Sequence, residues 1–88
     1  MKIKYSNKIS WQLFQDKVFV INEVTHKQYT FDGIYKWFWL QLKDEILLEN
    51  IVKKIHLSVV EVDYHEILMD YQVYVNKLKK EGLLEELR

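Results

Sequence analysis

The sequence predicts an α+β fold, in which a three-stranded antiparallel sheet is followed by three helices (βββααα). Three observations support this prediction. Apolar and polar residues alternate over residues 9–14 and 28–31, as in strands with one buried face. Apolar residues recur at helical spacing in the second half of the chain. The segments are joined by short polar connections, which favour antiparallel neighbours.

The first third of the chain is expected to form the sheet. Residues 18–21 are apolar throughout, which predicts a second strand covered on both faces. Polar turns at residues 15–17 and 22–27 separate it from the alternating strands on either side. The residues expected on the buried face of the two outer strands are Ile9, Trp11, Leu13, Tyr29 and Phe31.

The middle of the chain predicts two helices. The first covers residues 33–42 with Asp32 as its N-cap, and it is apolar nearly all round, so we expect it to be buried. Its aromatic residues, Trp39 in particular, should pack against the sheet. Residues 48–55 place apolar side chains at i, i+3, i+4 and i+7, which predicts a second, amphipathic helix of about ten residues.

A third helix is predicted between Asp63, its N-cap, and Glu81. Gly82 breaks the pattern, and a glycine is typical just after a helix end. Leu83 and Leu84 follow at once, so the chain should fold back there and bury its end. On a helical wheel, one face carries Tyr71, Tyr74, Val75 and Leu78, and the opposite face carries Met69 and Val73.

Composition narrows the classes of function. The 88 residues form one domain, expected over residues 1–88, with 13 basic and 13 acidic residues and no cysteine. A net charge of zero argues against a dedicated nucleic-acid binder, because phosphate neutralisation supplies much of that affinity. No signal peptide or membrane-spanning run is present, so we expect a cytoplasmic protein.

The sequence offers no set of residues typical of catalysis. Its three histidines, His26, His56 and His65, lie on different elements and lack metal-ligand spacing. Asp63 and Glu66 share a helix face, but they fit better as solvated acids at a helix N-terminus. We therefore expect a protein that is not an enzyme and that holds neither a metal nor a cofactor.

Over roughly residues 9–84, which would form the core, the chain resembles the PqqD-like family, named after pyrroloquinoline quinone biosynthesis protein D and also called RiPP recognition elements. The resemblance rests on residues 16–22 and 26–32, on Phe38-Trp39 at the place of an Ile-Trp pair, and on the helix ending over residues 70–84. The chain departs from the family pattern at Tyr35, where a glycine is usual, and it has no glycine at residues 43–44.

The resemblance implies a small winged helix-turn-helix that binds the leader segment of a ribosomally made precursor peptide. The peptide would add a strand to the third strand, in a cleft beside the third helix. The module would present it to a maturation enzyme such as a radical SAM enzyme, a leader peptidase or a cyclase. The peptide-binding residues expected on these grounds are Lys27, Gln28, Tyr29, Thr30, Ile67, Leu68, Tyr71 and Tyr74.

Two other interpretations stay open from the sequence. A winged-helix DNA-binding transcription regulator shares this architecture, although the third helix opens with acidic rather than basic residues. An oligomerisation domain, acting as a homodimer, is supported by the outward-facing Met69 and Val73.

Overall fold

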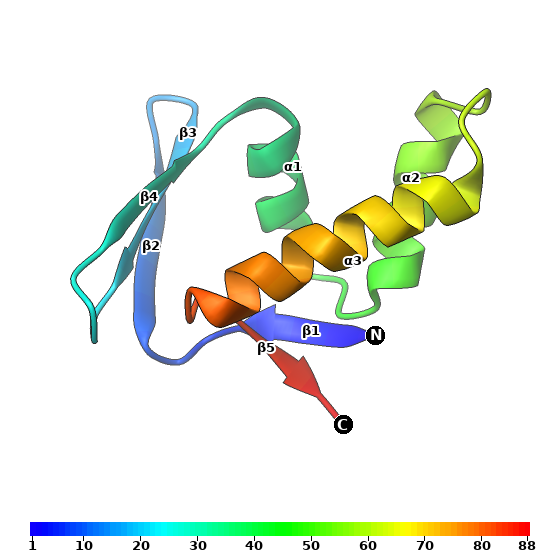
Figure 1. The fold of residues 1–88 in the computed structure, drawn as a ribbon. Helices are drawn as coiled ribbons and strands as arrows, with labels where there is room; N and C mark the ends of the chain where they lie inside the picture. Colours follow the sequence, from blue (N-terminus) through cyan, green and yellow to red (C-terminus); the bar gives the residue numbers. More distant parts are fainter.

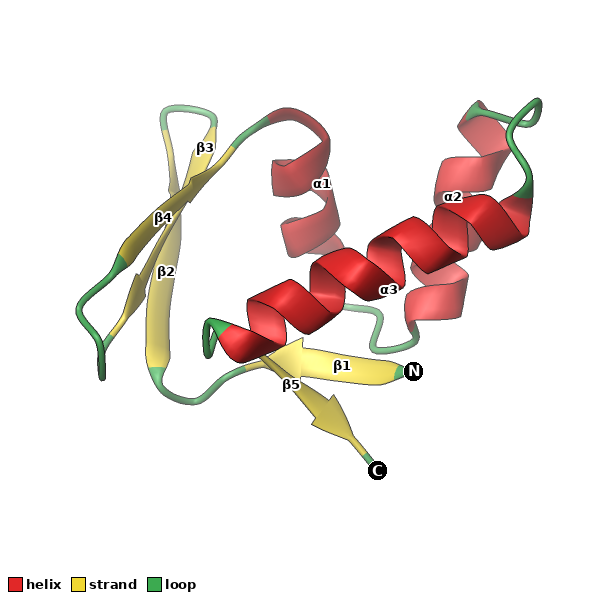
Figure 2. Cartoon of the chain, viewed as in Figure 1, coloured by secondary structure: helices red, strands yellow, loops and turns green.

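A three-stranded sheet and three helices make up most of the fold, as predicted (Figures 1 and 2). The computed structural model describes residues 1–88. A separate two-stranded ribbon, which we did not predict, joins the first strand to the last. In chain order, the elements are β1 (Lys2–Tyr5), β2 (Ile9–Phe14), β3 (Lys17–Asn22), β4 (Gln28–Phe31), α1 (Gly33–Gln41), α2 (Leu48–Ser58), α3 (Tyr64–Lys80) and β5 (Leu84–Leu87).

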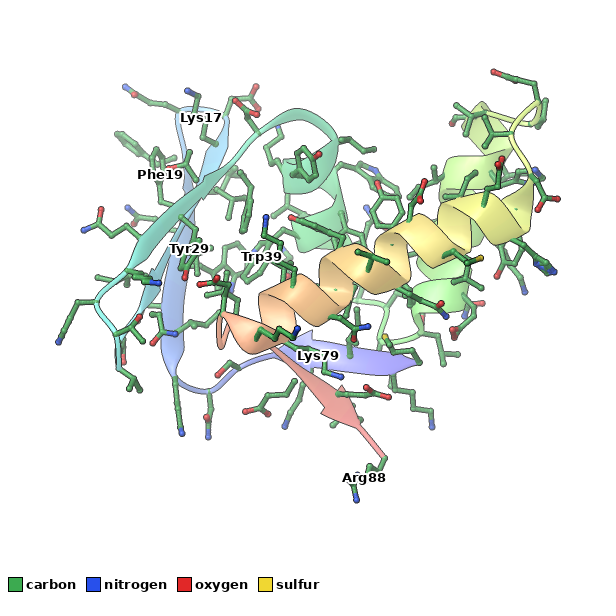
Figure 3. All side chains as sticks on the ribbon, in the orientation of Figure 1. Lys17, Phe19, Tyr29, Trp39, Lys79 and Arg88 are labelled. Atoms are coloured by element: carbon green, nitrogen blue, oxygen red, sulfur yellow. The ribbon has the colours of Figure 1, made fainter.

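The sheet has the order β2-β3-β4 with both ladders antiparallel, so β2 and β4 are its edges. The middle strand alternates between its two faces, because Val18 and Val20 are buried while Phe19 is exposed. Figure 3 shows Phe19 pointing away from the helices, on the other side of the sheet from Trp39. The expectation that residues 18–21 are covered on both faces is therefore wrong. The helices cover one face only.

The Trp39 side chain packs α1 against the sheet. It is 1% exposed, and its ring centroid lies 5.3 Å from that of Phe31 on β4 and 6.0 Å from that of Trp11 on β2. Tyr5 on β1 packs against it at 4.8 Å and donates its hydroxyl to the Trp39 carbonyl. This cluster confirms the predicted burial of Trp39.

The rest of α1 is less buried than predicted. Ile34 and Tyr35 in its first turn are about half exposed, so the helix is not covered all round. Asp32 occupies the predicted N-cap position, but its side chain makes no capping hydrogen bond. An apolar surface therefore remains open where β4 passes into α1.

The other two helices follow the predicted pattern. The α2 side chains of Leu48, Ile51 and Val52 are buried. At the start of α3, the Asp63 carboxylate accepts a hydrogen bond from the His65 N–H at 3.1 Å, as expected for an N-cap. The large apolar side chains that α3 turns outward are Met69 and Val73, which are 65% and 72% exposed. None of the helices has both the length and the apolar composition needed to cross a bilayer.

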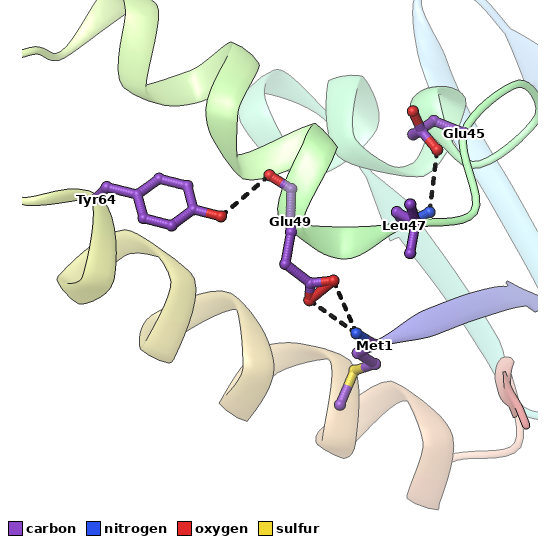
Figure 4. A network of polar contacts seen from close by, with 5 residues as sticks. All are labelled: Met1, Glu45, Leu47, Glu49 and Tyr64. Atoms are coloured by element: carbon purple, nitrogen blue, oxygen red, sulfur yellow. Dashed lines mark hydrogen bonds and ion pairs between the residues drawn. The ribbon is translucent and has the colours of Figure 1, made fainter.

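The β1–β5 ribbon joins the two ends of the chain and lies beside the helices. Leu83 and Leu84 are buried, which confirms that the chain folds back after Gly82. The start of β1 is held against α2, because the amino group of Met1 lies 2.8 Å from both carboxylate oxygens of Glu49 (Figure 4). The Tyr64 hydroxyl donates to the Glu49 carbonyl at 3.3 Å, which links α3 to the same residue.

Replacing Trp39 with alanine should lower the free energy of unfolding by about 3–5 kcal/mol, because the change removes a large buried ring and leaves a cavity. Denaturant unfolding followed by circular dichroism measures the effect. Val73→Ala is the matched control, since its exposed side chain should change stability by less than about 0.5 kcal/mol. Equal stability of the two variants would contradict the central role of Trp39.

Candidate functional site

The open edge of β4 is the first part of the candidate site. The Asn22 N–H donates to the Lys27 carbonyl at 2.9 Å, so these residues form a bonded pair next to the β3–β4 ladder. Bonded and non-bonded pairs alternate along an antiparallel ladder, which makes Val20 and Tyr29 the next bonded pair. The N–H and C=O groups of Gln28 and Thr30 therefore point away from β3, toward the free edge.

The two faces of β4 differ in chemistry. Gln28 and Thr30 project their exposed side chains on the outer face, where they border a shallow cavity of about 240 Å³ that includes Phe19. Tyr29 and Phe31 project toward the helices and are partly buried. A strand added to this edge would place alternate side chains toward the solvent face and toward α3.

The end of α3 reaches β4 through Glu81. The Tyr29 hydroxyl donates to Glu81 Oε2 at 2.6 Å, and Lys27 Nζ lies 4.0 Å from the same oxygen. The hydrogen bond to this carboxylate raises the pKa of the Tyr29 phenol to about 12, with burial and the negative charge adding to the effect. The phenol therefore keeps its proton and the hydrogen bond throughout the neutral range.

Asn22 fixes the position of this helix end. Its buried side-chain amide donates to the Glu81 carbonyl at 2.9 Å, and its Oδ1 accepts from the N–H groups of Val24 and Thr25. Gly82, at φ +77°, passes so close that an added Cβ would lie 2.8 Å from Asn22 Nδ2. The β3–β4 turn and the end of α3 are thus locked together through one side chain.

A cavity of about 200 Å³ forms between α1 and α3, just beyond the Phe31 end of β4. It is lined by side chains from the first turn of α1 and from the middle of α3. Three of its five lining residues are tyrosines, and the ring centroids of Tyr35 and Tyr74 lie 5.3 Å apart. The complete lining is Ile34, Tyr35, Asp70, Tyr71 and Tyr74.

The residues expected to bind a peptide fall into two groups. The four on β4 and its approach lie along the open edge, while Tyr71 and Tyr74 line the nearby cavity. Ile67 is only 7% exposed and belongs to the core, and Leu68 packs against that core, so neither lines the cavity. All eight residues stay a proposal, and the six that lie along the edge or line the cavity are Lys27, Gln28, Tyr29, Thr30, Tyr71 and Tyr74.

Sequence reasoning missed three residues of this region. The sequence patterns place Asn22 in a turn and Glu81 at a helix end, and they mark Tyr35 as an aromatic residue of a buried helix. Each acts through a contact to an element distant in sequence, as in the 59-residue separation between Asn22 and Glu81. An asparagine between an apolar strand and a turn is the signal that could have been used, because its amide often organises such a turn.

The structure contains no cluster of three or more histidine, cysteine or acidic side chains placed to hold a metal ion.

The fold is that of a small α+β domain known from solved structures. The complex described as "TbiB1 in Complex with the TbiA(beta) Leader Peptide" superposes with a TM-score of 0.81 at 22% sequence identity, covering 97% of this chain and 98% of that one. No family model matches the sequence. No curated protein matches it either. The shared feature is therefore the fold.

Gly82→Ala should lower the free energy of unfolding by more than about 1 kcal/mol, because alanine is strained at this φ and its Cβ would collide with Asn22. Gly33→Ala is the matched control, since Gly33 also has a positive φ, +56°, but no atom within 4 Å of the new Cβ. Thermal or denaturant unfolding gives both values. A loss no greater at Gly82 than at Gly33 would show that the contact with Asn22 contributes nothing.

Tyr29 should titrate at unusually high pH. Its native pKa lies above that of an unfolded tyrosine, so its contribution to stability is complete below about pH 10 and is lost as the pH rises toward 12. NMR of the Tyr29 ring should show a midpoint near 12 in the parent protein and a lower one in Glu81→Ala. An unchanged midpoint in that variant would disprove the assigned cause.

Proposed function

We propose that the chain is a non-catalytic peptide-binding module that recognises the leader segment of a ribosomally synthesised precursor peptide. The leader adds a strand to the free edge of β4, and α3 forms the other wall of the site. The module then presents the leader to a maturation enzyme, such as a radical SAM enzyme, a leader peptidase or a cyclase. Presentation to an enzyme rests on the family resemblance of the sequence.

The observation that carries this proposal is the open edge of β4. Gln28 and Thr30 direct their backbone donors and acceptors outward, and no proline interrupts the strand. Main-chain hydrogen bonds to such an edge supply affinity with any sequence, and nearby pockets supply specificity. The cavity that Tyr71 and Tyr74 line lies at one end of the edge, so both requirements meet on one side of the molecule.

The solved structure with the same fold adds support, because that protein was captured with a leader peptide. A DNA-binding role, in contrast, finds no favourable feature. Asp63 caps α3, the first half of the helix carries Glu66 and Asp70, and no lysine or arginine lies between Lys54 and Lys77. A helix that enters the major groove needs positive charge on its exposed face.

Titration of the leader segment of a short precursor peptide encoded near this gene tests the proposal directly. With the protein labelled for amide NMR, the largest chemical-shift changes should fall on residues of β4 and of the cavity. The dissociation constant should be micromolar or tighter, which corresponds to a binding free energy of about 8 kcal/mol or more. Salt-sensitive binding to duplex DNA without peptide binding would overturn the proposal.

Proline substitutions should distinguish the backbone N–H groups of β4 that face the free edge from those that pair with β3. Thr30→Pro removes an outward N–H and spares the ladder, so the variant should stay folded and bind the leader at least tenfold more weakly, about 1.4 kcal/mol. Tyr29→Pro removes an N–H of the ladder itself and should disturb the fold. Circular dichroism and calorimetric titration measure the two effects.

Thr30→Ala is the matched control for the backbone, because it shortens the same side chain and keeps the N–H. Its affinity should stay close to that of the parent protein. If a folded Thr30→Pro variant and the Gln28→Pro variant both bind the leader normally, the peptide docks elsewhere.

A further inference from the structure

The six tyrosines of the chain divide into two groups by their hydroxyls. In the first group each hydroxyl donates a hydrogen bond to another residue of the protein, namely Trp39, Glu81 or Glu49. In the second group no hydroxyl has a partner within the chain, and all three residues line the cavity between α1 and α3. The first group is Tyr5, Tyr29 and Tyr64, and the second is Tyr35, Tyr71 and Tyr74.

The rings of the second group stand at large angles to one another. Tyr35 and Tyr74 are inclined by 51° at a centroid distance of 5.3 Å, and Tyr71 and Tyr74 are perpendicular at 6.3 Å. All three rings border the same cavity. A tyrosine is neutral at physiological pH, and burial raises the pKa of Tyr71 and of Tyr74 further above that range.

The charge of the cavity comes from one residue. Asp70 is the only charged group in the lining, and it takes part in none of the five ion pairs of the structure. The remaining lining residue is the aliphatic Ile34. The cavity thus combines three tyrosine rings, their free hydroxyls and one carboxylate outside the ion pairs.

We infer that this cavity binds a cationic side chain, the ammonium of a lysine or the guanidinium of an arginine carried by the bound peptide. Aromatic faces attract a cation through their quadrupole, and enclosures of several rings are suited to alkylated ammonium groups. The tyrosine hydroxyls accept hydrogen bonds from the N–H donors of the cation, and Asp70 supplies the opposite charge. An apolar side chain in the same place would displace water from the carboxylate and the hydroxyls without replacing the hydrogen bonds of that water.

This inference rests on the proposed function and makes it more specific. Only Asp32 separates Phe31, the last residue of β4, from Gly33, the first of α1. The cavity therefore lies where a peptide paired with β4 leaves the edge. The basic residue belongs just outside the stretch that pairs with Gln28 and Thr30.

The first experiment measures the affinity of the leader peptide with its basic residues replaced one at a time, lysine by norleucine and arginine by citrulline. One replacement should weaken binding at least about fivefold. The same replacement should have little effect on the Asp70→Asn/Tyr35→Ala double variant. A peptide that binds with no such position, or with an equal loss in the double variant, overturns the inference and leaves the proposed function intact.

A second experiment does not depend on the leader. Butylammonium and butylguanidinium chloride are titrated into the protein at constant ionic strength, with 1-butanol as the neutral probe, while NMR follows the rings of Tyr35, Tyr71 and Tyr74. The cations should shift these signals saturably, and Asp70→Asn should weaken their binding by about fivefold. Glu66→Gln is the matched control, since it removes an exposed acid one helical turn away that does not line the cavity. Shifts by butanol equal to those by the cations overturn the inference.

Discussion

One buried amide side chain sets the geometry on which the candidate site depends. Asn22 lies at the end of β3, and it binds both the turn that leads into β4 and the carbonyl at the end of α3. A buried polar group is costly unless its hydrogen bonds are made, so the helix end and the sheet are held at one separation. Glu81 is carried to the inner face of β4 by the same contact, and the hydrogen bond from Tyr29 follows from it. The contact therefore fixes the distance between β4 and the end of α3, which form the two walls of the site.

Much of the fold could be predicted from local patterns. The bounds of β2 and β4, the N-cap at Asp63 and the helix stop at Gly82 were found from residues close together in the sequence. The β1–β5 ribbon was missed because its partners, such as Lys2 and Leu87, lie at opposite ends of the chain and neither strand exceeds four residues. Periodicity shows that a segment has an apolar face but not what covers it. The exposed outer face of β3 and the open first turn of α1 were misjudged for that reason.

The candidate site was only partly predictable. That β4 is an edge follows from the strand order, and its freedom from proline could be seen in the sequence. The helix wall was harder, because a helical wheel ranks positions by face without saying which face meets the core. Ile67 and Tyr71 lie one turn apart, yet one is buried in the core and the other lines the cavity. The backbone donors of Gln28 and Thr30, but not that of Tyr29, point to the free edge. This assignment could be made only from the observed hydrogen bond between Asn22 and Lys27.

The shortness of β4 has a consequence for the lifetime of any complex. Only two of its four residues direct their backbone groups outward, so an added strand would gain few main-chain hydrogen bonds, and these bonds alone would give a moderate affinity. With association at about 10⁶ M⁻¹s⁻¹, a micromolar complex dissociates on the order of once per second. If the proposed function holds, a longer edge would form more main-chain hydrogen bonds and would release the peptide more slowly. A four-residue strand suits repeated exchange rather than storage.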